Sequence, residues 1–379
     1  MKKKILATAM AGIMAFGMMI LPVQAKPIPM ASVNGVEFNT LTEAFQVANQ
    51  YPGSTIEILS DATYDSTMLT FEDVTINMNG HTITRTNSEA RWLVGGIEEP
   101  DDLGGKAPKT LPKIVINGGN GSTITDADNA RGEISTPHIS VQYADITINE
   151  VNMINKMYDE DSSAFCIRDA ANATLNNCNL EGWAALKIYR QYGTGTSNLT
   201  INGGTLVSKV GADTTYKASA ILGHSDTHYD TNVMINGATI YSKNSAALAL
   251  TPRCYVTIKD STITGTSGIY FTAGSLNIQN SVITATGAFV EAPPHDKDQD
   301  GAYTVNSYDG SAIQIISNNI FNDRIPVTIS DDCKIISTNG YAIREIGGKD
   351  GSGVSLVDLK AGNAEISGAL GTIAILPAE

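Results

Sequence analysis

The sequence is poor in cysteine and has no cysteine spacing typical of a metal centre. Four cysteines occur in 379 residues, and no two of them stand in a C-x-x-C pair. Scaffolds built on disulfides are far denser in cysteine, and structural zinc sites draw on closely spaced thiolates. The sequence therefore predicts thiols that fill a core, and it leaves any disulfide pairing open. The four are Cys166, Cys178, Cys254 and Cys333.

Basic residues are also scarce. The chain has 25 lysines and arginines against 39 aspartates and glutamates, which gives a formal net charge of −14. Nucleic acids and anionic membranes bind basic surfaces. The composition therefore argues against both as partners.

Only one long apolar run is present, and it lies at the N-terminus. Lysines at positions 2 to 4 precede an apolar stretch from Ile5 to Val23, and Val23-Gln24-Ala25 resembles a cleavage site. This order is typical of a secretory signal peptide rather than of a membrane anchor. Residues 1–25 are therefore predicted to be a signal peptide. Their removal leaves a secreted or cell-surface chain of net charge −17 that does not insert into the membrane.

The sequence contains one motif that recurs with variations, for example LTINGGTLVS at residues 199–208. Aligned on the apolar residue before the usual Asn, the repeats are separated by 40, 32, 27, 26, 34, 23, 20 and 51 residues. Fixed strands joined by turns of variable length are typical of a β-solenoid. The aligned residues are Ile76, Ile116, Ile148, Leu175, Ile201, Ile235, Ile258, Ile278 and Ile329.

Each repeat predicts three short strands. A second apolar residue follows five positions after the aligned one in most repeats, across a tight corner rich in Asn and Gly. Asn directly follows the aligned residue in six repeats; stacked amides would form a hydrogen-bonded ladder, and Asn tolerates the left-handed backbone of a corner. A third strand opens with a small residue, as in SAFCIRD from Ser163 and AALKIYR from Ala184. Nine or ten coils at about 4.8 Å each predict a rod of about 45 Å.

These corners, the Asn ladder and the third strand resemble the right-handed parallel β-helix of the pectate-lyase-like superfamily. The stretch VNGVEFNTLTEAFQVANQYPGSTIEILSD is similar to the N-terminal cap of such rods, and Thr40 with Glu43 predicts a capping box for a helix there. The apolar face of that helix comprises Leu41, Ala44, Phe45 and Ala48. The resemblance implies an all-β monomer with a cap over residues 26–73 and a single-stranded right-handed parallel β-helix over 74–379.

Signatures of the well-defined enzymes on this fold are missing. The polygalacturonase-like glycosidases resemble one another through NTD, a DD pair, GHG and RIK. Here the nearest phrases are GHS at residues 223–225 and an isolated Asp331-Asp332 pair, and no WIDH-like stretch of a pectate lyase occurs. Such motifs specify the fold more strongly than the function.

The outward or loop-entry positions of the third strands carry cations and aromatic residues. Successive coils would align these side chains into one column, which is unexpected in an acidic chain. A basic column suits an acidic polysaccharide, because its carboxylates repeat along a line as the coils do. The residues are Arg168, Asp169, Lys187, Tyr189, Arg190, His224, Asp226, Arg253 and Tyr270, of which Arg168, Asp169, Arg253 and Tyr270 are predicted to bind the polysaccharide.

The alternative is a polysaccharide lyase that cleaves a uronate polymer by β-elimination. That reaction needs a cation to neutralise the carboxylate, a base to take the adjacent proton and an acid for the leaving oxygen. Arg168 or Arg190 would neutralise the carboxylate, Lys187 or His224 would be the base, and Tyr189 the acid. The sequence leaves binding and cleavage open.

Two segments offer metal ligands. DKDQDG begins as an EF-hand-type calcium loop does, although Ser307 stands where that family has Glu. HSDTHYD places His224, Asp226 and His228 at alternate positions, which suits a transition metal only if the segment is a strand. Calcium is therefore the one cofactor predicted. Its ligands would be Asp296, Asp298 and Asp300.

Overall fold

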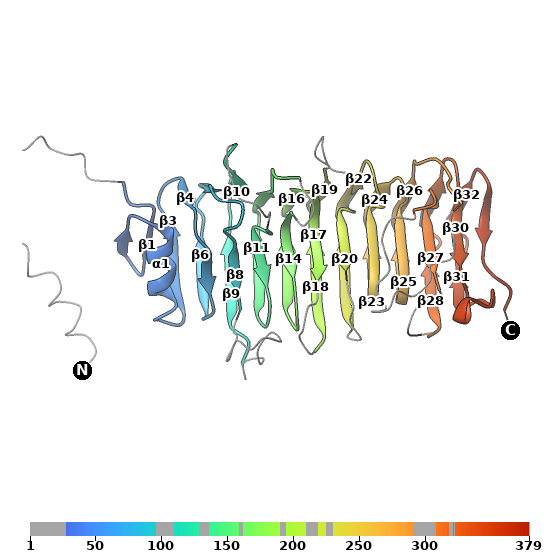
Figure 1. Ribbon diagram of the computed structural model, residues 1–379, viewed down its shortest axis with the longest axis horizontal. Coiled ribbons are helices and arrows are strands. Elements are labelled where there is room, and N and C mark those ends of the chain that lie inside the picture. Colours follow the sequence, from blue (N-terminus) through green and yellow to red (C-terminus); the bar gives the residue numbers. More distant parts are fainter. Residues whose placement is uncertain are drawn as a thin grey trace, which may run out of the picture.

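The structure is a computed structural model, and it shows an elongated stack of short strands in which the first and the last described strands lie at opposite ends (Figure 1). It describes residues 28–95, 110–128, 136–158, 162–189, 195–209, 219–224, 230–291, 308–317, 321 and 323–378. The strands form one sheet of 22 and one of 11 members, and apart from the N-terminal strand β1 all pair in parallel. The prediction of an all-β, solenoid-like chain is confirmed.

The first strand of each repeat belongs to the first-strand stack. The nine aligned apolar residues of the sequence lie opposite one another in it, and Ile56 adds a tenth at the N-terminal end. The strands are β3 (Ser54–Ile58), β6 (Val74–Asn77), β9 (Lys113–Asn117), β12 (Asp145–Asn149), β15 (Asn172–Asn176), β18 (Ser197–Asn202), β21 (Thr231–Asn236), β23 (Leu248–Lys259), β25 (Ile269–Gln279), β28 (Ile325–Ile329) and β31 (Val357–Lys360).

The second-strand stack forms the 11-stranded sheet. Its inward residues include Met153, Leu180 and Leu206, in the register that the five-residue spacing predicts. The strands are β4 (Ala62–Tyr64), β7 (Thr82–Arg85), β10 (Thr123–Asp126), β13 (Asn152–Ile154), β16 (Asn179–Gly182), β19 (Thr205–Ser208), β22 (Thr239–Ser242), β24 (Thr262–Gly265), β26 (Val282–Ala285), β29 (Lys334–Ser337) and β32 (Glu365–Gly368).

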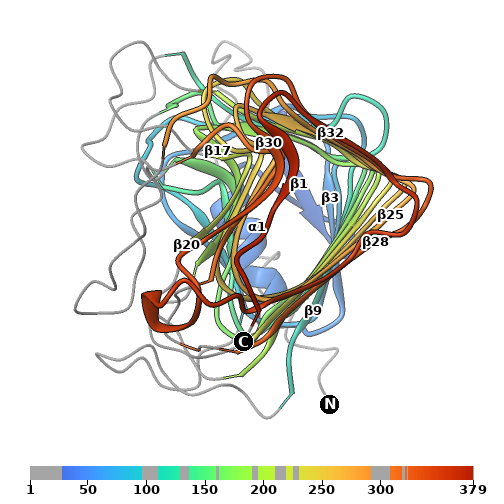
Figure 2. The ribbon, with the colours of Figure 1, turned by 90° about the vertical axis from the view of Figure 1, so that its right-hand side faces the viewer.

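The third-strand stack merges with the first because β23 and β25 run through both without a break. Phe165, Leu186 and Ile221 lie in register and are fully buried. The remaining strands are β5 (Met68–Thr70), β8 (Trp92–Val94), β11 (Ile139–Val141), β14 (Ser163–Ile167), β17 (Ala184–Tyr189), β20 (Ile221–His224), β27 (Ile313–Ile316), β30 (Tyr341–Ile346) and β33 (Gly371–Ala374). Figure 2 shows the stacks end-on. The inward side chains of the three stacks form one apolar core.

The corner after each first strand is made by two successive residues with different tasks. The recurring Asn joins a side-chain ladder: Asn149 donates to Asn117 at 2.9 Å, and Asn176 donates to Asn149 at 2.8 Å. The left-handed backbone falls on the next residue, with φ of 56° at Glu150 and 51° at Asn177. The ladder is as predicted, but the left-handed position lies one residue later, because the amide must stay in the strand to face its neighbours.

The N-terminal end is covered by a hairpin and a helix. Strands β1 (Ala31–Val33) and β2 (Val36–Phe38) pair antiparallel, and β1 pairs antiparallel with β3. Helix α1 (Leu41–Ala48) starts where the sequence predicts, with the Thr40 hydroxyl accepting from the Glu43 amide at 3.2 Å. The four predicted apolar residues of α1 are buried.

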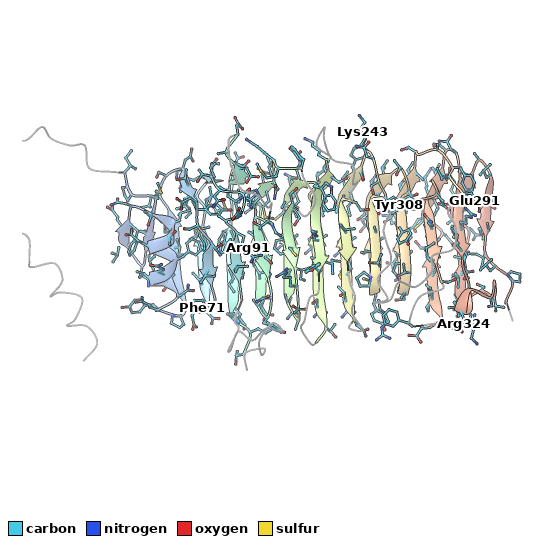
Figure 3. All side chains as sticks on the ribbon, viewed as in Figure 1. Phe71, Arg91, Lys243, Glu291, Tyr308 and Arg324 are labelled. Carbon is cyan, nitrogen blue, oxygen red and sulfur yellow. The ribbon has the colours of Figure 1, made fainter. Side chains whose placement is uncertain are left out.

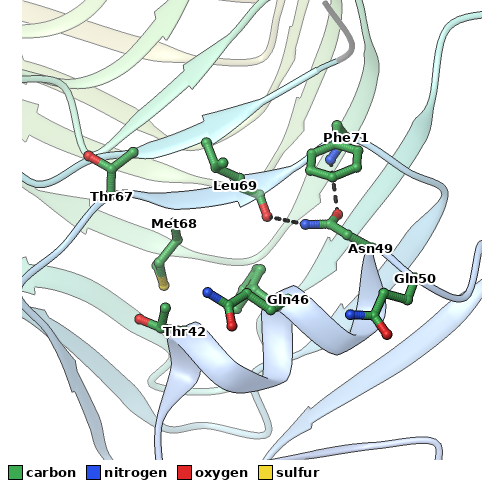
Figure 4. Close-up of a pocket in the computed structure, with 9 residues that line it drawn as sticks. Thr42, Gln46, Asn49, Gln50, Thr67, Met68, Leu69 and Phe71 are labelled. Carbon is green, nitrogen blue, oxygen red and sulfur yellow. Dashed lines mark hydrogen bonds between the residues drawn. The ribbon is translucent and has the colours of Figure 1, made fainter.

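Asn49, at the end of α1, ties the helix to β5. Its Nδ2 donates to the Leu69 carbonyl at 2.8 Å, and its Oδ1 accepts from the Phe71 amide at 3.1 Å (Figure 4). At the other end of the rod, a short 3₁₀ turn, η1 (Lys349–Gly351), precedes β31. None of the helices in the described ranges has the length and apolar character needed to cross a membrane. All four cysteines are buried, and none forms a disulfide.

Candidate functional site

Strands β14 and β17 place several of the predicted site residues on the outer face of the third-strand stack. Cys166 lies opposite Lys187, and Tyr189 lies opposite His224 of β20. Since side chains alternate along a strand and Leu186 points inward, Lys187 and Tyr189 both point outward. Arg168 follows directly after β14 and so enters the same face.

On this face, cations contact aromatic rings. The Arg168 guanidinium lies 5.0 Å from the centroid of the Tyr189 ring. Lys187 Nζ lies 5.7 Å from the same centroid and 5.8 Å from that of Trp183. Lys187 is only 7 % exposed, so its ammonium group is largely removed from water and held against two rings. We call Arg91, Arg168, Lys187, Tyr189 and Trp183 the cationic cluster.

Arg91 belongs to this cluster because its charge interacts with that of Arg168. Burial lowers the pKa of Arg91, and the nearby positive charge of Arg168 lowers it further. Burial raises the pKa of the Cys166 thiol, while the charges of Arg168 and Lys187 oppose that rise. Arg91 makes no side-chain hydrogen bond or ion pair with any residue that the structure describes. Three positively charged side chains therefore lie near one another on this face. Arg91 lies on the broad face turned to the viewer in Figure 3.

The other described candidates have different surroundings. Asp169 is 5 % exposed, beside Arg168 in the chain. Arg253 is neutralised within the protein: its Nε lies 2.5 Å from Asp230 Oδ1, and its Nη1 lies 3.3 Å from Asp323 Oδ2. Tyr270 occupies an outward position of its strand but is fully buried. Its ring lies edge-on to that of Tyr308, with 5.5 Å between the ring centroids. Arg253 and Tyr270 thus do not join the cationic cluster.

Several predicted residues lie outside the described part of the chain. Arg190, Asp226 and His228 are among them, and of His224 only the backbone is described. The predicted signal peptide and the three calcium ligands Asp296, Asp298 and Asp300 also lie outside it. The described residues contain no cluster of side chains suited to a metal ion. Calcium therefore stays a prediction.

The isolated Asp331-Asp332 pair has a structural task. Asp331 Oδ1 accepts from the Asn363 amide at 2.8 Å, and Asp332 Oδ1 accepts from the Asn280 amide at 3.1 Å. Hydrogen bonds from Ser330 and from the Asn280 amide lower the pKa of Asp332. Both carboxylates thus fasten neighbouring corners.

A second charged cluster, which the sequence did not reveal, is fully buried at the corner between the second and third strands. Arg85 Nε lies 2.6 Å from Asp126 Oδ1, and His138 Nε2 lies 3.3 Å from Asp126 Oδ2. The Tyr64 hydroxyl lies 3.4 Å from His138 Nδ1, and the Lys156 amide donates to Asp126 at 2.8 Å. We call Tyr64, Arg85, Asp126 and His138 the buried network.

The electrostatics of the buried network point to a structural role. Burial by itself would raise the pKa of Asp126, but the hydrogen bond from His138 and the charges of His138 and Arg85 lower it to about 2. Burial, opposed by the charge of Arg85, raises the pKa of Tyr64. Neither Arg85 nor His138 has any exposed surface. The network therefore holds coils together and offers no surface to a ligand.

Comparison of the chain with protein-family models, with curated proteins and with solved structures gave no match.

Proposed function

We propose that the protein is a secreted or cell-surface right-handed parallel β-helix of the pectate-lyase-like type that binds an acidic polysaccharide. The binding site is the cationic cluster on the outer face of the third-strand stack. One observation carries this proposal: Arg168 and Lys187 both lie against the Tyr189 ring, and Arg91 is near enough to Arg168 for their charges to interact, in a chain whose net charge is −14.

The chemistry of the cluster fits a uronate chain. Guanidinium and ammonium groups bind carboxylates through charge-assisted hydrogen bonds. The partly exposed ring of Tyr189 offers an apolar surface to the C–H face of a sugar, and the rings of Tyr189 and Trp183 hold the cations in place. Because the chain as a whole is acidic, a local positive field also selects the site at which an anionic polymer arrives.

Affinity electrophoresis in polygalacturonate, alginate and hyaluronan gels tests the proposal. The unmutated protein is expected to be retarded by at least one polymer, and less so as salt screens the charges. Arg168→Gln with Lys187→Met should weaken retention roughly fivefold to tenfold, because two ion pairs are lost. Methionine keeps the Lys187 side chain packed against Trp183, so the fold is retained.

Lys243→Met is the matched control for this experiment. Lys243 is an exposed cation just after β22, at the upper edge of the rod in Figure 3 and away from Arg91. Its replacement removes one charge and should leave retention unchanged. Equal losses in the control and the double variant, or no retention of the unmutated protein, would contradict the proposal.

Cleavage by β-elimination is the second candidate function. It is favoured by the contact of Tyr189 with both Arg168 and Lys187, since this places a phenol, a carboxylate-binding cation and an amine together. The same polymers, incubated with the protein, would then gain the ultraviolet absorbance of an unsaturated uronate end. Tyr189→Phe should abolish that signal and preserve retention. Retention without absorbance assigns binding alone.

The predicted calcium loop and export belong to the same proposal. Calcium, bound by Asp296, Asp298 and Asp300, would order the long insertion rather than take part in chemistry. Calorimetry should show one calcium site that Asp298→Ala abolishes, and no heat with the unmutated protein would end this part of the proposal. Recovery of a chain beginning at residue 26 from the culture medium tests the signal peptide.

A further inference from the structure

The outer face of the first-strand stack repeats one pattern in successive coils. In β15 and β18, the outward residues are Asn, Thr and Asn, separated by single inward residues. The register places like residues opposite each other, so that Asn172 faces Asn198 and Thr174 faces Thr200. The result is a flat face with three columns of amides and hydroxyls.

Side-chain hydrogen bonds fix the outer amide column. Asn172 Nδ2 donates to Asp145 at 2.6 Å, Asn198 donates to Asn172 at 2.6 Å, and Asn232 donates to Asn198 at 2.8 Å. An Asn amide has two donors and two acceptor positions, and this ladder uses one of each within the column. Asn198 therefore keeps one N–H and one lone pair for a ligand, in an orientation already set. Asn232 lies at the end of the ladder and donates without accepting from another amide, so both of its acceptor positions remain for a ligand.

An exposed aromatic ring continues this column. Tyr255 lies opposite Asn232 in the register of β21 and β23, and its side chain is 41 % exposed. No residue in the described ranges stacks on the Tyr255 ring or hydrogen-bonds to its hydroxyl. A shallow groove runs beside it, and its outward side chains are Asn198, Thr200, Asn232, Met234, Tyr255, Thr257, Ser275 and Asn277.

The groove is uncharged. None of the residues that line it carries a charged side chain, although the chain as a whole is strongly acidic. Two cations of β23 flank the groove: Arg253, two residues before Tyr255, is paired with Asp230 and Asp323, and Lys259, two residues after Thr257, lies 3.9 Å from Asp260. An ion would gain little here, so the ligand that fits is neutral.

We propose that this face, which we call the amide face, is a second carbohydrate site that binds a neutral glycan chain lying across the strands. A sugar ring has an apolar C–H face that an exposed tyrosine covers, and hydroxyl groups that both donate and accept, as the free positions of Asn198 and Asn232 do. The polar groups repeat at the strand spacing of about 4.8 Å, so an extended chain meets equivalent partners in successive coils. This site does not depend on the cationic cluster.

Calorimetric titration with neutral hexasaccharides tests the amide face. The probes are cellohexaose, xylohexaose, mannohexaose and chitohexaose, each at low and high salt. At least one should bind, with an affinity that salt does not change, because no ion pair is formed. Tyr255→Ala should weaken that affinity about tenfold, and Tyr255→Phe should leave it unchanged, because the ring and not the hydroxyl makes the contact.

Tyr241→Ala is the matched control. Tyr241 is 40 % exposed, almost as much as Tyr255, but it lies on β22 in the second-strand stack. Its replacement should not change binding. The proposal is overturned if no hexasaccharide binds, if Tyr255→Ala binds as tightly as the unmutated protein, or if the two alanine variants lose the same affinity. The acidic polymers and the Lys187 variant report separately on the cationic cluster, so failure of one site is distinguishable from failure of the other.

Discussion

The amide face and the face that carries the cationic cluster are built from the same repeat and differ in what each coil contributes. On the first-strand side, successive coils present the same residue, as Asn149, Asn176 and Asn202 do in the corner ladder. On the third-strand side, one outward column reads Ser140, Cys166, Lys187, Leu222, Ala249, Tyr270 and Gln314. Repetition there is confined to the inward residues. The repeating side gives a uniform surface, and the irregular side can place a group that occurs once.

The two sides are also held together differently. The amide ladder joins its coils through many similar, neutral hydrogen bonds, each of which contributes a small free energy. The buried network joins a few N-terminal coils through one ion pair from which water is excluded. Breaking a contact of each kind should therefore have unequal effects on the free energy of unfolding.

Removing the charge of Asp126 should have the largest effect. Asp126→Asn keeps the shape of the side chain but leaves the buried Arg85 charge uncompensated, which destabilises a protein by about 3–5 kcal/mol. Urea unfolding measures the loss. Asp128→Asn is the control, since Asp128 pairs with Lys156 in solvent and its replacement should leave the urea midpoint unchanged. Equal midpoints for the two variants would contradict the role given to the buried network.

Lowering the pH should have the second-largest effect, because it removes the stabilisation that Asp126 gives the buried network. The pKa of Asp126 is about 2 in the folded protein, against 3.8 for an ordinary Asp side chain. A lowered pKa means that the folded state holds the proton less tightly, so this stabilisation is present above about pH 5 and is lost as the pH falls towards 2. The difference in unfolding free energy between the unmutated protein and Asp126→Asn should shrink by about 2 kcal/mol across that interval. A difference that is independent of pH would contradict the account.

Interrupting the ladder should have a smaller effect. Asn176→Ala removes the donor to Asn149 and the acceptor for Asn202, and water reaches these half-buried amides and replaces part of each bond. We expect a loss of about 1 kcal/mol in urea unfolding. Thr174→Ala, which replaces an outward side chain in the same strand, should lower the free energy of unfolding by less. A ladder variant as stable as this control would show that the amides contribute nothing to stability.

The sequence predicts the repeating parts of this fold better than the parts that occur once. The register of Ile201 and its counterparts is readable because every coil buries an equivalent residue, and that burial leaves a periodic mark. The sequence predicts the left-handed backbone conformation one residue too early in each corner. Asn177 and Gly203 favour that conformation at least as much as the Asn residues that precede them. Helix α1 was predicted correctly because its cap and its apolar face both lie within one short stretch.

The site was less predictable because it depends on contacts between coils. Arg91 and Trp183 stand at positions that no repeat requires, so neither was identified from the sequence. Lys187 was correctly placed outward, but its near-complete burial depends on the neighbouring rings of Trp183 and Tyr189. The buried network was missed for the same reason: Arg85 and Asp126 are 41 residues apart, and stacking alone brings them together.

One measurement tests the central claim that the two faces bind chemically different glycans. The affinities of polygalacturonate and of the neutral hexasaccharide that binds best are measured for three proteins: the unmutated chain, Arg168→Gln with Lys187→Met, and Tyr255→Ala. We predict that the double variant loses affinity only for the acidic polymer, and that Tyr255→Ala loses affinity only for the neutral one. Loss of both ligands in a single variant, or loss of neither ligand in both variants, would contradict the account.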